Sequence, residues 1–108
     1  MIKMEKLYYI YIVRSKTNTL YTGITTDIGR RMDEHMNDKK KGAKYTRAFK
    51  IDRLELVLTT NGRSNASKIE CFIKSFTRQE KEMFIKDPQI IVEMILDKKS
   101  IKANVVKI

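Results

Sequence analysis

The sequence is poor in chain breakers and in cysteine: its 108 residues include four Gly, one Pro and one Cys. One cysteine cannot close an internal disulfide, and one Cys with one His cannot build a zinc finger. No apolar run approaches the roughly 20 residues that span a bilayer, and the charged N-terminus lacks the apolar block of a secretory signal. We therefore expect an intracellular protein outside the membrane, cytoplasmic in a bacterium or nuclear if the host is a eukaryote or one of its viruses.

Acidic residues are also scarce. The chain has 13 Asp and Glu against 23 Lys and Arg, which gives a formal charge of +10, and 42% of its residues are hydrophobic. That apolar share is too high for a disordered chain, and the length suits one domain over residues 1–108. A strongly basic surface attracts polyanions and releases their counterions. Nucleic acid is therefore the favoured partner, and an anionic membrane surface is second.

Hydrophobic periodicity predicts an α+β domain. Apolar and β-branched runs predict a hairpin of strands over 7–13 and 20–24, with Gly23 marking a close backbone approach or a bulge. A third strand is expected over 54–60, after a basic loop over 37–53. Helices are expected over 27–37, 64–76, 78–86 and 88–97. Val105 and Val106, in the basic tail, fit either an added strand or a loose end.

Three polar side chains lie beside predicted apolar stripes. Arg31 and His35 are four residues apart and share one face of the 27–37 helix. Glu70 lies on the flank of the stripe that the next helix buries. Two of them have an ordinary structural alternative: His35 as a hydrogen-bonded core histidine, and Glu70 in a salt bridge to an Arg or Lys at the core edge. Arg31 is unusual there, because a partly buried guanidinium needs an anionic partner. The hairpin tyrosines are likewise ordinary strand residues when taken singly.

Taken in order, these residues resemble a GIY-YIG nuclease, in particular the small single-domain bacterial-type members of that family. Tyr9-Ile10-Tyr11 corresponds to the first half-motif, with Tyr9 in place of the usual Gly, and Tyr21-Thr22-Gly23 corresponds to the second. Arg31 and His35 follow on a helix, and Glu70 follows on the helix after the third strand. The resemblance covers about residues 7–86 and leaves a C-terminal helix and basic tail over 87–108.

The resemblance implies a three-stranded antiparallel sheet flanked by helices, and hydrolysis of DNA phosphodiester bonds to 5′-phosphate and 3′-hydroxyl ends. It also implies one divalent metal ion, Mg²⁺ or Mn²⁺, held by Glu70. Tyr11 would be the general base, supported by Tyr21. Arg31 would hold the scissile phosphate, and His35 would orient the nucleophile or a tyrosine hydroxyl.

The basic loop is expected to hold the DNA backbone on either side of the cut. Its candidate contacts are Lys39, Lys40, Lys41, Lys44 and Arg47. Because no DNA-targeting domain is expected, the chain should select a DNA structure rather than a sequence, in repair or recombination, alone, as a homodimer or with a protein partner. The alternatives are a non-catalytic nucleic-acid-binding module with the same fold, and a small basic interaction protein whose tyrosines and Glu70 are structural.

Overall fold

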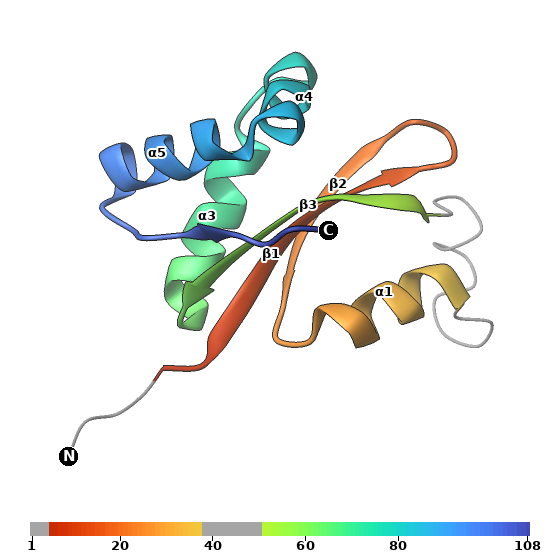
Figure 1. Cartoon of the computed structure of the whole chain (residues 1–108), viewed down its shortest axis with the longest axis horizontal. Coiled ribbons are helices and arrows are strands. Elements are labelled where there is room, and N and C mark those ends of the chain that lie inside the picture. Colours follow the sequence, from red (N-terminus) through yellow and green to blue (C-terminus); the bar gives the residue numbers. More distant parts are fainter. Residues whose placement is uncertain (1–4, 38–50) are drawn as a thin grey trace.

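A computed structural model of the chain describes residues 5–37 and 51–108, which form one antiparallel sheet with helices on both faces (Figure 1). The elements in chain order are β1 (Leu7–Ser15), β2 (Leu20–Thr25), α1 (Ile28–Asn37), β3 (Ile51–Asn61), α3 (Arg63–Lys74), α4 (Arg78–Lys86), α5 (Pro88–Lys99) and β4 (Asn104–Val105). The predicted hairpin, the third strand and all four predicted helices are therefore confirmed. Within the described ranges, no helix is long and apolar enough to cross a membrane.

The sheet has the strand order β2-β1-β3-β4, so it has four strands where we expected three. The fourth strand forms because the tail turns back along β3: Leu58 pairs with Val105, and the Val106 N–H donates to the Val57 carbonyl at 2.9 Å. β3 also begins at Ile51, inside the stretch assigned to the basic loop. Its first residues include the exposed Asp52 and Arg53, whose polarity hides the strand pattern.

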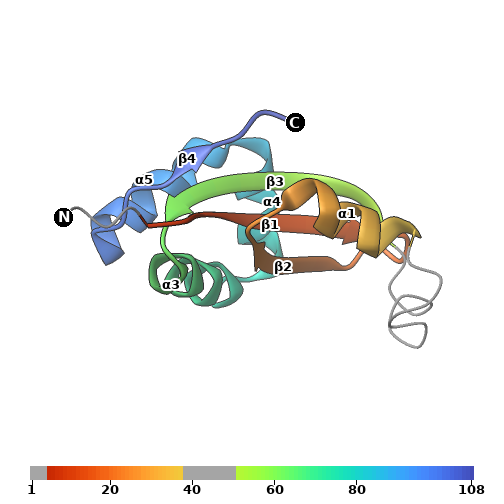
Figure 2. The same ribbon diagram turned by 90° about the horizontal axis from the view of Figure 1, so that it is seen from below.

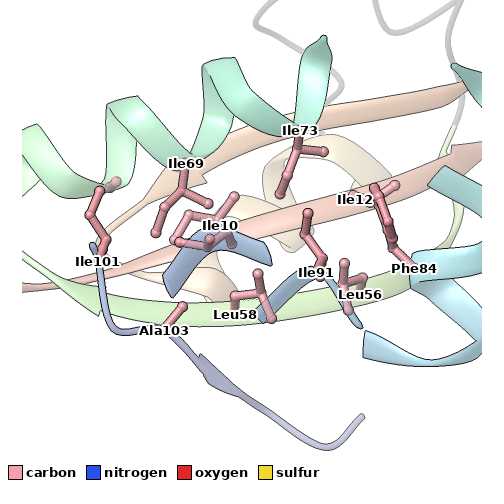
Figure 3. Packing of buried hydrophobic residues seen from close by; sticks show 12 residues of the cluster. Ile10, Ile12, Leu56, Leu58, Ile69, Ile73, Phe84, Ile91, Ile101 and Ala103 are labelled. Atoms are coloured by element: carbon pink, nitrogen blue, oxygen red, sulfur yellow. The ribbon is translucent and has the colours of Figure 1, made fainter. Parts of the chain in front are cut away.

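The larger core lies on the face that β1 and β3 turn toward α3, α4 and α5. Ile10 and Ile12 of β1 alternate to this face with Leu56 and Leu58 of β3. Figure 3 shows how the helices cover them, with Ile69 of α3 above the sheet. The remaining buried members of the cluster are Ala66, Ile73, Phe84, Ile91, Ile95, Ile101 and Ala103. Aliphatic burial of this extent is the main source of the fold's stability.

The opposite face carries a smaller core under α1. Tyr11 and Val13 of β1 and Val57 of β3 are buried there, and Ile28 and Met32 of α1 pack against them. Figure 2 shows α1 on one face of the sheet and the other helices on the other face. From Tyr8 to Val13, successive residues of β1 therefore contact the two cores in turn.

A helix cap and a set of ion pairs position the helices that cover the larger core. Thr77 and Glu80 form the capping box that the sequence predicts at the start of α4, with Thr77 Oγ1 accepting from the Glu80 N–H at 3.2 Å. Arg14 of β1 donates to Glu55 of β3 and to Glu82 of α4, and its side chain is 11% exposed. Because Arg14 bridges two strands and a helix, it ties α4 to the sheet.

Candidate active site

The side chain of Tyr11 lies across the neighbouring strand, over Gly23. Tyr11 and Gly23 are directly paired in the β1–β2 ladder. A Cβ atom placed on Gly23 would lie 2.6 Å from Cζ of the Tyr11 ring, far inside van der Waals contact. The close approach expected at Gly23 is therefore confirmed. Glycine at this position lets the Tyr11 ring extend over β2, the edge strand of the sheet.

The hydroxyl of Tyr11 contacts two side chains of α1. Arg31 Nε donates to Tyr11 Oη at 3.3 Å, and Tyr11 Oη lies 3.3 Å from Nε2 of His35. The Tyr11 and His35 rings meet edge to face, with centroids 6.0 Å apart. Because Arg31 and His35 are one helical turn apart, a single helix delivers both to one phenol oxygen. The structure thus brings together three of the five predicted catalytic residues.

The start of α1 is fixed by Asp27, which places these two side chains. Asp27 Oδ1 accepts from the Arg30 N–H at 3.0 Å, and Thr25 Oγ1 accepts from the Asp27 N–H at 3.1 Å. Such bonds satisfy N–H groups that have no partner within a helix. The helix is also held by Ile28 and Met32 in the smaller core. Arg31 and His35 lie beside these two residues on the same side of the helix, so packing of Ile28 and Met32 carries them to Tyr11.

Burial and the nearby Arg31 guanidinium lower the pKa of His35 from its ordinary value. His35 is therefore neutral at pH 7 and carries one ring proton. Since Tyr11 Oη already accepts from Arg31, its own hydrogen is free to point at Nε2 of His35, which then holds its proton on Nδ1. The Tyr11 hydroxyl is thus contacted by a cation on one side and by a neutral imidazole on the other.

The other two predicted catalytic residues belong to β2 and α3. Tyr21, on β2, packs against the same small core as Tyr11. Glu70 belongs to α3, on the face opposite α1, and α3 packs across β2 and β1. The Glu70 side chain is 22% exposed, and its ion-pair partner is Lys74, whose Nζ lies 3.3 Å from Oε2. The salt bridge that the sequence offered as the structural alternative for Glu70 is therefore present.

Sequence reasoning missed two neighbours of these residues. Glu34 accepts from Arg31 NH1 at 3.5 Å, and the three-residue spacing of the pair on α1 is the signal that predicts this contact. Lys74 was not singled out, although its four-residue spacing from Glu70 has the same meaning. Five predicted DNA contacts lie outside the described residues: Lys39, Lys40, Lys41, Lys44 and Arg47.

The described residues offer one plausible kind of metal site. Among residues 5–37 and 51–108, no three His, Cys, Asp or Glu side chains gather closely enough to hold a metal ion. Mg²⁺, however, commonly binds through one or two carboxylates, several waters and a substrate phosphate. Glu70 supplies one partly buried carboxylate, and the side chain of its ion-pair partner Lys74 is exposed. It fits a metal ion that is completed by water and substrate, and it does not fit a closed structural site.

Comparison with known proteins identifies relatives over nearly the whole chain. The model of the GIY-YIG catalytic domain matches residues 7–87. A UPF0213 protein of Fusobacterium nucleatum is 35% identical over 88% of this chain and 93% of its own length. A UPF0213 protein of Pectobacterium carotovorum is 41% identical over 78% of this chain and 84% of its own. The solution NMR structure of a UPF0213 protein from Bacillus halodurans is 35% identical, with a TM-score of 0.48 over 74% of this chain and 83% of that one.

Proposed function

Since the chain belongs to the GIY-YIG family, a family of nucleases, we propose that it is an endonuclease that hydrolyses DNA phosphodiester bonds with the help of a divalent metal ion. One observation carries the proposal: Tyr11, Arg31 and His35 converge on a single phenol oxygen at the edge strand of the sheet. A tyrosine used only for packing does not need a cation and a neutral imidazole on its hydroxyl.

Tyr11 is proposed as the general base. A free phenol has a pKa near 10, so it accepts a proton at neutral pH only with help from its neighbours. Arg31 stabilises negative charge on Tyr11 Oη through its Nε–H, and His35 accepts the hydrogen that the phenol gives up. The phenol oxygen can then take a proton from water as its own proton passes to Nε2 of His35.

The same arrangement favours the transition state of hydrolysis. The attacking water oxygen forms a bond to phosphorus, and the bond from phosphorus to the 3′-oxygen breaks, which leaves 5′-phosphate and 3′-hydroxyl ends. Charge spreads over the phosphate oxygens in such transition states. The Arg31 guanidinium is about half exposed, at 45%, so its remaining N–H groups are accessible to a phosphate. Arg31 therefore serves both the base and the phosphate.

A divalent metal ion, Mg²⁺ or Mn²⁺, is proposed to bind through the Glu70 carboxylate. Nucleases of this family generally use divalent metals. Such an ion supplies Lewis-acid neutralisation of the phosphate charge. Because α3 contacts β2 on the face of the sheet opposite α1, we propose that Glu70 approaches this edge strand from one face and Tyr11 from the other. We propose that the scissile phosphate lies at this edge, with Tyr21 of β2 supporting Tyr11.

The proposed substrate is DNA, held by the basic segment between α1 and β3. Residues 38–50 contain six Lys and Arg against one Asp, and so carry half of the chain's formal charge of +10. Five of these are the proposed phosphate contacts: Lys39, Lys40, Lys41, Lys44 and Arg47. Phosphate contacts fix position without reading sequence. We therefore propose selection of a DNA structure, such as a branch or a damaged site, in repair or recombination.

A cleavage assay tests the proposal. Single-stranded, duplex and branched DNA are incubated with wild-type protein and Mg²⁺ or Mn²⁺, and with Glu70→Ala. Wild type should nick DNA and leave 5′-phosphate ends, whereas Glu70→Ala should bind DNA without cutting it. Equal background cleavage by the two proteins would overturn the enzyme, and retained binding would then favour the non-catalytic nucleic-acid-binding module.

A further inference from the structure

The solvent side of α3 carries a stripe of four side chains with Glu70 in it. Arg63, Ser67, Glu70 and Lys74 follow one another at steps of four, three and four residues, so they lie along one flank of the helix. Arg63 and Lys74 are exposed, and Ser67 is partly exposed and small. At 1.5 Å per residue, Arg63 lies about 10 Å and Lys74 about 6 Å along the helix axis from Glu70. The stripe therefore places a cation on each side of the proposed metal ligand.

The two members of the ion pair between Lys74 and Glu70 differ in their exposure to solvent. Glu70 is mostly covered, with 22% of its side chain exposed, whereas Lys74 is 55% exposed. A surface pair of this kind contributes little to stability, and a lysine ammonium sits on a flexible four-carbon stem. Lys74 can therefore leave Glu70 at small cost when another anion is offered.

We propose that Lys74 exchanges partners during substrate binding: it neutralises Glu70 in the free protein and moves to a DNA phosphate when a divalent ion occupies the carboxylate. The inference rests on the proposed function, since it takes Glu70 as the metal ligand. A doubly charged cation on Glu70 repels an ammonium group that lies 3.3 Å from the same carboxylate. The displaced ammonium would then be available to a DNA phosphate, and this contact would make α3 a DNA-contacting surface.

Charge removal at Glu70 imitates the metal ion and allows the test to run without cleavage. In EDTA, the affinity for a short DNA duplex is measured over a series of monovalent salt concentrations. Glu70→Gln releases Lys74, so it should tighten binding and steepen the log–log salt slope by about 0.9, the value of one phosphate contact. Adding Lys74→Gln to Glu70→Gln should remove that gain. Lys74→Gln in the wild-type background should leave the slope nearly unchanged, because Lys74 is then bound to Glu70.

A second lysine pair provides the matched control. Lys98 of α5 lies 3.8 Å from Asp97, and its side chain is 65% exposed. Figure 2 places α3 toward the β2 side of the sheet and α5 toward the β4 side. Asp97→Asn, alone and combined with Lys98→Gln, changes the net charge of the protein by the same amounts as the α3 variants. The effect of Lys98→Gln on the salt slope should be the same whether Asp97 is present or replaced. Circular dichroism checks that each variant keeps its helices.

Two results would overturn the exchange. An equal decrease of the slope by Lys74→Gln in both backgrounds would mean that Lys74 binds phosphate without leaving Glu70. No change of the slope in either background would mean that Lys74 does not contact DNA. Both results are independent of the cleavage assay. If wild-type protein cuts DNA and Glu70→Ala does not, the proposed function stands even when the exchange fails. If the salt slopes follow the prediction but no protein cuts DNA, α3 is a DNA-binding surface and the proposed hydrolysis is wrong.

Discussion

The two faces of the sheet are built from alternate residues of the same strand, yet their side chains differ in kind. Ile10 and Ile12 of β1 enter an aliphatic core that α3, α4 and α5 close. Tyr11, between them, faces α1 and carries a hydroxyl bound to Arg31 and His35. One face thus stabilises the fold, and the other presents polar groups at the edge of a small core. A rigid strand shared by both faces holds Tyr11 in position for chemistry.

The largest expected effect is a loss of stability after a substitution in the aliphatic core. Ile91 of α5 is fully buried. Ile91→Ala should lower the free energy of unfolding by about 2–5 kcal/mol, because it removes buried methyl groups and leaves a cavity. Met32→Ala, on the partly buried face of α1, should cost less. Urea unfolding measures both, and the cleavage rate per folded molecule should stay near wild type for Ile91→Ala. Equal losses of stability would contradict the division between the faces.

The next effect separates the position of Tyr11 from its chemistry. Gly23→Ala places a methyl group against the Tyr11 ring and should move the hydroxyl away from Arg31 and His35. Misplacement of a reacting group by about 1 Å can cost about 100-fold in rate. Gly29→Ala is the matched control, since its added Cβ would meet only Asp27 Oδ1, at 3.7 Å. The rate of single-turnover cleavage should fall for Gly23→Ala and not for Gly29→Ala. Full activity of Gly23→Ala would show that cleavage does not depend on the present position of the Tyr11 ring.

The smallest effect concerns the protonation of His35. Its pKa is lowered, so the neutral form that accepts the Tyr11 proton persists below the ordinary value of about 6.5. The cleavage rate should stay level as pH falls from 7 to 6.5 and decline about tenfold per pH unit only below the lowered pKa. His35→Gln, which does not titrate, should be slower and lack this decline. A wild-type rate that falls between pH 8 and 7 would contradict a neutral His35.

Local patterns were sufficient for most of the secondary structure. The Thr77 capping box and the proline at the start of α5 marked two helix starts, and both helices begin where these signals predicted. The missed parts depend on distant partners. β4 exists because Val105 pairs with Leu58, 47 residues earlier, which no local pattern contains. The early start of β3 was hidden by exposed polar residues that pair with β1.

The site was predictable only in part for the same reason. Helical spacing placed Arg31 and His35 on one face, but nothing local shows that this face meets Tyr11, 24 residues before His35. The family resemblance suggested that grouping, and the structure shows the contacts. The position of Glu70 relative to the others depends on how α3 crosses β2, which is a property of packing. The same limit applies to Arg14, whose partners Glu55 and Glu82 lie 41 and 68 residues away.

The most direct test of the central claim is to remove the Tyr11 hydroxyl and compare its effect on cleavage with its effect on stability. Tyr11→Phe keeps the ring over Gly23 and loses the bonds to Arg31 and His35. Mg²⁺-dependent single-turnover cleavage should fall by about 10²–10⁴, the usual contribution of a general base, while the free energy of unfolding changes by about 1 kcal/mol. An unchanged cleavage rate in a Tyr11→Phe protein that folds normally would contradict the account.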